Sequence, residues 1–252
     1  FAALILAQMG LRPLVLERRS EVGGGAITRE VAPGFRVPAY THEVLLHDEI
    51  VKGLDLGRHG LEPLLPPVTA CAIDPRGAAP VMLSDEASAT ADGLAARGGA
   101  DARRYLEFRT TVDRMTALLA PLLAHEVPRA GVPAMGDLWQ LFVTARAVRA
   151  LGARESRRLL RWLTMPIADV LDEYFDDDLL KALVAGPSLS GSMRGPRAGG
   201  TMFTFLLRES HRRLARSANL RARGGPGAVT RALASAARAA GVRNGDAHSA
   251  RG

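Results

Sequence analysis

The chain has 252 residues, of which 47% are apolar and 23% are charged. That length and composition allow a buried core in one or two domains, and they exclude disordered and fibrous proteins. The single cysteine, Cys71, excludes an internal disulfide, a Cys-x-x-Cys redox pair and a cysteine-rich zinc site. No run of about 18 apolar residues occurs, so no transmembrane segment is predicted, and a cytoplasmic location is expected.

The net charge of +7 comes almost wholly from arginine, because Lys52 and Lys181 are the only lysines. An alanine- and arginine-heavy composition is typical of a GC-rich genome. The alternative is a basic face for nucleic acid or for an acidic membrane. No stretch interleaves basic and aromatic residues as a stacking platform for bases would. We therefore expect no nucleic-acid partner, whereas peripheral membrane contact stays open.

The first 28 residues contain the most informative order of elements. Residues 1–9 are almost wholly apolar, which predicts a helix buried on several sides, and Gly10 suits the position after its end. Residues 14–16 form a short apolar run typical of a strand, which ends in Glu17. The three glycines at 23–25 allow the backbone to approach another group closely or to take positive φ angles.

The rest of the chain divides into a mixed part and a helical part. Turn residues and short apolar runs predict strands and loops over residues 31–84, with one helix near 48–54. From Asp101 the apolar residues recur every three or four positions, which predicts helices. We expect them at residues 101–122, 135–151, 155–163, 167–175, 179–184, 201–215 and 228–240.

Three segments around these helices have their own expected roles. The acidic run Asp176–Asp178 is expected to cap a helix N-terminus rather than to bind a metal. The glycine-rich residues 186–200 are expected to interrupt the helices. Residues 243–246 follow the last helix and do not resemble a strand.

The order of helix, Gly10, strand and Glu17 matches the second half of a dinucleotide-binding βαβ unit. In such a unit a first strand leads into a G-x-G-x-x-G loop that opens the helix. An acid at the end of the second strand accepts hydrogen bonds from the adenosine ribose. The sequence lacks that first strand and loop, so we expect the chain to begin inside the helix and to be truncated at both ends.

Residues 14–19 followed by residues 22–28 resemble the second FAD-contacting segment of phytoene desaturases and amine oxidases. Within that superfamily, Gly25-Ala26 resembles the desaturase-like branch. Further segments resemble the same branch in the same order: residues 33–35, 59–61, 165–175, 190–196, 199–201 and 224–234. The chain is therefore similar, over about residues 1–242, to the phytoene-desaturase-like FAD-dependent oxidoreductases, a group with bacterial members.

The resemblance implies an α/β fold, with an incomplete Rossmann-like FAD-binding domain and an inserted, mainly helical substrate domain. The FAD-binding domain would take residues 1–75 and 223–252, and the substrate or cap domain residues 76–222. FAD is the implied cofactor, with Glu17 at the ribose and the glycines near the pyrophosphate. The implied cofactor-binding residues are Glu17, Arg18, Arg19, Gly23, Gly24, Gly25 and Ala26.

The intact enzyme is expected to transfer a hydride from an apolar small-molecule substrate to FAD. Because the flavin carries the redox chemistry, no side chain is assigned a catalytic role. Two other classes stay open: a non-catalytic flavin-fold protein acting through protein partners, and a basic nucleic-acid-binding protein.

The candidate residues have plainer interpretations as well. Glu17 could be a solvated strand end, Gly23–Gly25 a plain turn, and Arg18 and Arg19 a solvated pair. The six histidines show no close metal-ligand spacing, so no metal site is predicted.

Overall fold

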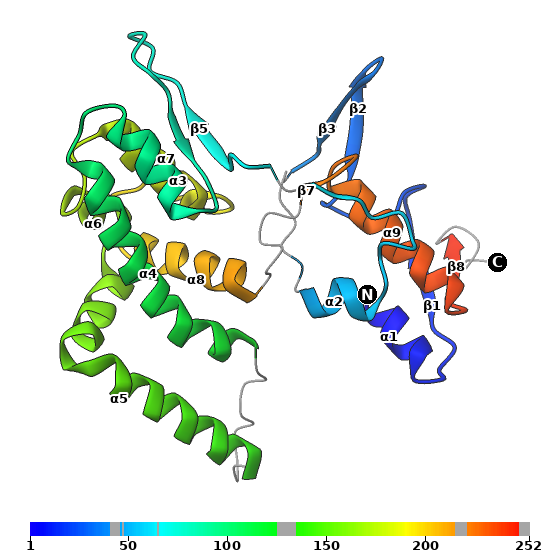
Figure 1. Cartoon of the computed structure of the whole chain (residues 1–252). Helices are drawn as coiled ribbons and strands as arrows, with labels where there is room; N and C mark the ends of the chain where they lie inside the picture. Colours follow the sequence, from blue (N-terminus) through cyan, green and yellow to red (C-terminus); the bar gives the residue numbers. More distant parts are fainter. Residues whose placement is uncertain (41–45, 47, 65, 125–134, 215–220, 247–252) are drawn as a thin grey trace. The chain divides into compact units, whose positions relative to one another are not determined.

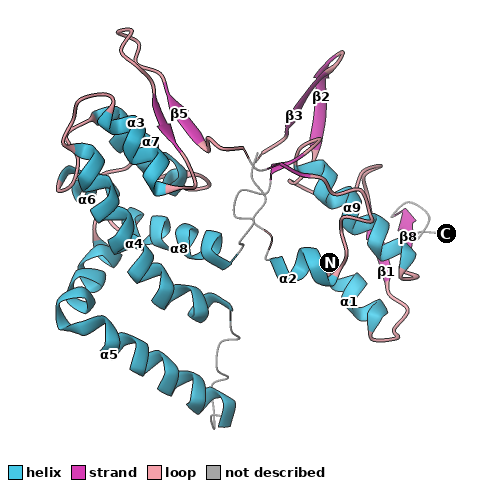
Figure 2. Cartoon of the chain, in the orientation of Figure 1, coloured by secondary structure: helices cyan, strands magenta, loops and turns pink. Residues whose placement is uncertain are grey.

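The computed structural model describes residues 1–40, 46, 48–64, 66–124, 135–214 and 221–246 (Figure 1). Helices and short strands both occur along the chain, consistent with an α/β protein (Figure 2). The chain forms two compact units. Unit 1 comprises Phe1–Leu65 and Ala215–Gly252, and unit 2 comprises Pro66–Leu214.

Strand pairing places both unit boundaries about ten residues from the predicted ones. Strand β5 (Ala70–Ala72) pairs antiparallel with β6 (Val81–Leu83), so residues 66–75 lie in unit 2. Strand β4 (Pro63–Leu64) pairs with β7 (Arg221–Ala222), so residues 221–222 lie in unit 1. Turn signals in the sequence do not reveal which strands pair, which is why the predicted boundaries differ.

A parallel strand pair organises unit 1. Strands β1 (Leu14–Glu17) and β8 (Arg243–Asp246) run side by side, with Leu14 opposite Arg243. Parallel strands require a crossover connection, and helix α9 (Pro226–Ala239) leads into β8. The other elements of the unit are α1 (Ala2–Gln8), β2 (Thr28–Ala32), β3 (Phe35–Pro38) and α2 (Asp48–Gly53).

Strand β8 corrects the expectation that residues 243–246 do not form a strand. Their backbone pairs with β1 whatever side chains they carry. Gly245 contributes by its lack of a side chain, because a Cβ there would lie 3.1 Å from Leu16 Cδ2. The segment is a strand because of its neighbour and not because of its own apolar pattern.

Helix α1 corrects a second expectation. The helix forms as predicted, but Leu4 is its only buried residue, and Ile5 and Leu6 are 37% and 40% exposed. The reason is that Leu4 alone reaches the core of unit 1. That core consists of Leu4, Leu54, Leu56, Leu61, Ala222, Ala228, Val229, Ala232 and Ala236.

Unit 2 is mainly helical. Its helices are α3 (Ala87–Ala95), α4 (Asp101–Ala124), α5 (Met135–Thr164), α6 (Ile167–Asp172), α7 (Asp178–Leu189) and α8 (Thr201–Leu214). Sequence analysis did not predict α3. Helix α5 is broken at Gly152 (φ 81°, ψ 160°), in agreement with two predicted helices. Helix α7 continues through Gly186 and Pro187, where an interruption was expected, because its buried face extends to Ser188.

An aromatic cluster around Phe108 forms the centre of unit 2. The Phe108 ring lies 5.3–6.1 Å from four other rings, measured between centroids. These rings come from α5, α8 and the turn that follows α6: Trp162, Tyr174, Phe175 and Phe205. The predicted apolar face of α4 is confirmed for Tyr105, Phe108, Val112 and Met115, which are all buried, but not for Leu122, which is 43% exposed. No helix that the structure describes, α4 included, is long and apolar enough to cross a membrane.

The acidic run before α7 has the predicted capping role. The Asp177 carboxylate accepts hydrogen bonds from the backbone N–H groups of Leu179 and Leu180 at 2.8 and 3.3 Å. The buried Asp101 carboxylate accepts from the N–H groups of Asp176 and Asp177. These bonds satisfy backbone donors where the helix begins and tie α4 to α7.

A buried carboxylate also joins α4 to α8. Glu209 is 8% exposed and accepts from Arg109 Nη1 at 2.7 Å and from Arg212 Nη1 at 3.1 Å. Burial acts to raise the pKa of Glu209, but the two guanidinium groups outweigh it and hold the pKa below its ordinary value. The carboxylate is therefore charged in the folded protein at neutral pH.

We expect Glu209→Gln to lower the free energy of unfolding by about 3 kcal/mol at neutral pH, since it leaves guanidinium groups without their buried partner. Because the folded-state pKa is lowered, the stabilisation is full above the unfolded value, near 4.5, and is lost as pH falls through the folded value. Urea unfolding against pH measures both effects. Glu107→Gln is the control, because Glu107 is 63% exposed in its ion pair and should contribute less than about 0.5 kcal/mol.

Candidate functional site

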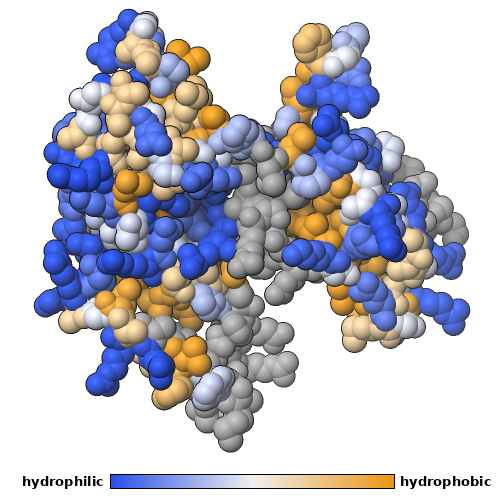
Figure 3. Space-filling model, viewed as in Figure 1, coloured by the Kyte–Doolittle hydropathy of each residue, from blue (hydrophilic) through white to orange (hydrophobic). Residues whose placement is uncertain are grey.

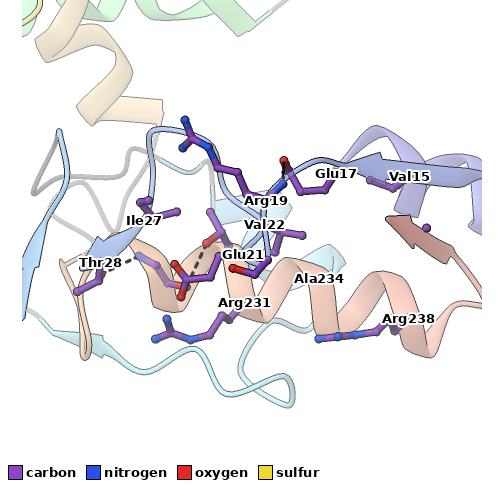
Figure 4. Close-up of a pocket in the computed structure, with 14 residues that line it drawn as sticks. Val15, Glu17, Arg19, Glu21, Val22, Ile27, Thr28, Arg231, Ala234 and Arg238 are labelled. Atoms are coloured by element: carbon purple, nitrogen blue, oxygen red, sulfur yellow. Dashed lines mark hydrogen bonds between the residues drawn. The ribbon is translucent and has the colours of Figure 1, made fainter. Parts of the chain in front are cut away.

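A pocket of about 290 Å³ lies in unit 1 at the carboxyl end of β1 (Figure 4). Three segments line it: residues 15–28, helix α9 and strand β8. Ligands of open α/β sheets bind outside the carboxyl ends of parallel strands, which is where this pocket lies. The polar side chains that line it are Glu17, Arg19, Ser20, Glu21, Thr28, Thr230, Arg231 and Arg238.

Glu17 is the last residue of β1, and its half-buried side chain lines the pocket. Alternation along the strand puts Val15 and Glu17 on the pocket side, while Leu14 and Leu16 are exposed on the other face. One carboxylate oxygen, Oε1, accepts a hydrogen bond from the backbone N–H of Arg19 at 2.9 Å. This bond fixes the carboxylate at the turn that follows the strand.

The loop after Glu17 is attached to the first turn of α9 by two threonines. Thr28 Oγ1 donates to the Gly224 carbonyl at 2.9 Å and accepts from the Gly227 N–H at 3.1 Å. Thr230 Oγ1 donates to the Ala26 carbonyl at 3.2 Å. These bonds join residues about 200 positions apart and hold the two sides of the pocket together.

Glycines permit this close approach. A Cβ on Gly225 would lie 2.6 Å from Thr28 Oγ1, and one on Gly227 would lie 2.8 Å from the Thr28 nitrogen. A Cβ on Gly23 would lie 2.8 Å from Thr230 Oγ1. Three glycines from two distant segments are therefore required by the contact between the loop and α9.

A second, more polar recess of about 290 Å³ adjoins the first. It is lined by Glu21, Thr28, Glu30, Arg36, Gly224 and Arg231. The Gly34 N–H and the Arg36 guanidinium both hydrogen-bond to the Glu30 carboxylate and lower its pKa. Arg231 lines both recesses, so one cation of α9 faces two acidic side chains, Glu21 and Glu30.

The structure separates the predicted cofactor-binding residues into two groups. Glu17 and Arg19 line the pocket, whereas Arg18, Gly23, Gly24, Gly25 and Ala26 do not. Gly23 is packed against Thr230, while Gly24, with φ 58°, has no other residue within 4 Å of where its Cβ would be. A role for these glycines at a cofactor stays a prediction.

Sequence analysis missed the contribution of α9. Thr230, Arg231 and Arg238 line the pocket but were not assigned to a site. The motif Gly224–Gly227 was the available signal, because it marks the return of the chain to unit 1. Among the described residues, no cluster of three or more His, Cys, Asp or Glu side chains could hold a metal ion.

The fold and pocket define an α/β protein with a helix-flanked parallel strand pair, and sequence comparison supports an oxidoreductase family. The chain is 28% identical over 264 residues to the rat (Rattus norvegicus) pyridine nucleotide-disulfide oxidoreductase domain-containing protein 2. That match covers 96% of this chain and 44% of the rat protein. The mouse (Mus musculus) protein of the same name is 28% identical over 223 residues, covering 81% of this chain and 38% of the mouse protein.

The similarity is that of a distant homologue. The chain spans less than half the length of these curated relatives. No family model matches the chain. The comparisons therefore support oxidoreductase ancestry in general, and the finer assignments are proposals.

We expect Gly225→Ala to destabilise unit 1 by about 3 kcal/mol, because it adds steric overlap with Thr28 to the strain of a positive φ angle. Gly241→Ala is the matched control at the other end of α9. Gly241 has a similar φ of 84° but open space around it, so its cost should stay near 1 kcal/mol. Hydrogen exchange of the α9 amides measures both; equal effects would contradict the packing role of Gly225.

Proposed function

We propose that the chain is part of an FAD-dependent oxidoreductase of the phytoene-desaturase-like group and that unit 1 binds the adenosine end of FAD. The observation that supports this most directly is the position of Glu17. Its carboxylate ends a parallel strand and lines a pocket there, as a ribose-binding acid does in dinucleotide-binding folds.

The pocket fits part of a dinucleotide. Pockets for whole ligands measure roughly 300–1,000 Å³, and this one, at about 290 Å³, lies at the lower limit. It has room for a nucleoside portion but not for a flavin ring in addition. Glu17 would accept hydrogen bonds from ribose hydroxyls, and the guanidinium groups of Arg19, Arg231 and Arg238 would neutralise phosphates.

The three glycines of the loop would then divide their roles. Gly23 packs against Thr230 of α9, so no further group fits on that side of it. Gly24 has open space and a positive φ, which would let a phosphate approach the backbone closely. We therefore assign the predicted pyrophosphate approach to Gly24 rather than to Gly23.

The bound flavin would supply the redox chemistry by accepting a hydride from an apolar small-molecule substrate. The contribution of the described residues of unit 1 is to bind and orient its adenosine end. We propose that the mainly helical unit 2 is the substrate or cap domain of the whole protein. A cytoplasmic location remains part of this proposal.

We expect the full-length protein to bind FAD and Glu17→Gln to weaken that binding at least about tenfold, because a charged hydrogen-bond acceptor is lost at the ribose. Quenching of flavin fluorescence in an FAD titration measures the affinity. Glu62→Gln is the control, since Glu62 is also in unit 1, is 69% exposed and does not line the pocket.

Folded full-length protein that binds no FAD would overturn the proposal. Equal FAD affinity in Glu17→Gln and the parent chain would overturn the role of Glu17. FAD binding without oxidation of any apolar substrate by the full-length protein would favour the alternative, a non-catalytic flavin-fold protein acting through protein partners.

A further inference from the structure

A tight turn in the glycine loop leaves backbone donors unused beside the pocket. The turn begins next to Val22, which lines the pocket, and the Ala26 N–H closes it by donating to the Gly23 carbonyl at 2.8 Å. Gly24, with φ 58°, and Gly25 occupy its two central positions. Their N–H groups donate no hydrogen bond to any part of the chain that the structure describes. Two successive backbone donors are therefore available to an anion.

The side chain of Tyr40 lies against this turn. A Cβ on Gly25 would be 3.5 Å from Tyr40 Cδ2, which is an ordinary van der Waals distance. The Ala39 N–H donates to the Ile27 carbonyl at 3.0 Å and so holds the backbone just before Tyr40 to the glycine loop. The contact therefore fixes where the ring begins, next to the two unused donors.

Packing within the fold does not account for Tyr40. Its side chain is 81% exposed, and its hydroxyl has no hydrogen-bond partner among the described residues. A tyrosine that serves a protein core is buried and its hydroxyl is bonded. Tyr40 follows hairpin β2–β3, which exposes orange apolar residues such as Phe35 next to blue charged ones (Figure 3). Phe35 offers only an apolar surface, whereas Tyr40 adds a hydroxyl donor beside the glycine loop.

The donors around the turn suit a phosphate. Residues 22–28 include no aspartate or glutamate, so no charge in this segment repels an anion. Gly24 has no other residue within 4 Å of where its Cβ would be, so a ligand can reach the backbone there. Hydrogen bonds to a charged acceptor are about twice as strong as those between neutral groups.

We propose that Tyr40 binds the cofactor by donating a hydrogen bond from its hydroxyl to the diphosphate, beside the N–H groups of Gly24 and Gly25. This inference rests on the proposed function, because it takes the ribose to be at Glu17. The diphosphate is joined to the ribose, so it continues from Glu17 along one wall of the pocket. The open backbone at Gly24 favours the wall formed by the glycine loop. Tyr40 then orients the diphosphate, while arginine side chains neutralise its charge.

Tyr40→Phe in the full-length protein tests the proposal, because it removes the hydroxyl and keeps the ring against Gly25. Displacement of bound FAD by ADP or by adenosine, followed by recovery of flavin fluorescence, measures the affinities. We expect the affinity for ADP and FAD to fall about tenfold, since a hydrogen bond to a charged group is lost. The affinity for adenosine, which has no phosphate, should change less than about twofold.

Two further variants serve as controls in the same assay. Tyr174→Phe removes a hydroxyl from a half-buried side chain of unit 2 and should change neither affinity. Glu17→Gln should weaken ADP and adenosine equally, because both contain the ribose. A merely structural role of Tyr40 would lower the urea midpoint of Tyr40→Phe, which we expect to equal that of the parent protein.

Unchanged ADP affinity in Tyr40→Phe, together with weaker binding in Glu17→Gln, would overturn the role of Tyr40 and leave the proposed function standing. An equal loss of ADP and adenosine affinity in Tyr40→Phe would also overturn it, because the hydroxyl would then not act at phosphate. Full-length protein that binds neither ADP nor FAD would overturn both proposals.

Discussion

The contact between the loop at residues 23–28 and the first turn of α9 is the constraint on which unit 1 depends. The two backbones meet at Gly23, Gly225 and Gly227, where no side chain keeps them apart. The hydroxyls of Thr28 and Thr230 then form hydrogen bonds between the two segments. This contact brings together segments about 200 residues apart. It places α9 against the carboxyl end of β1 and so forms both walls of the pocket. A side chain at any of these glycines would push the two walls of the pocket apart, whether or not a ligand is bound.

Unit 2 is stabilised mainly by an apolar core. Its core is a continuous cluster of aromatic and aliphatic side chains from β6 to α8, centred on Phe108. The core clusters of the two units share no residue. Two buried carboxylates add to the apolar core. Glu209 of α8 accepts a hydrogen bond from Arg109 of α4, and Asp101 of α4 accepts one from the backbone N–H of Asp177, just before α7. These interactions set the helix arrangement of unit 2.

Arginine is abundant in the sequence, and composition alone suggested that this is a trait of the genome. In the structure, arginine side chains have two distinct roles. Arg109 neutralises a buried carboxylate, and Arg231 lines a pocket beside two glutamates. The first role stabilises the fold. The second suits the phosphates of a dinucleotide, in line with the distant oxidoreductase homology.

Sequence alone determined what depends on near neighbours: most helices, the strand ending in Glu17, the helix break near Gly152 and the cap at Asp177. Apolar spacing and capping residues act within a few positions, so the sequence displays them. Tertiary structure alone decided the strand character of β8, the unit boundaries, the contribution of α9 to the pocket and the packing role of Gly23. Each depends on residues far apart in the chain, and no local pattern records which distant segment will supply the partner.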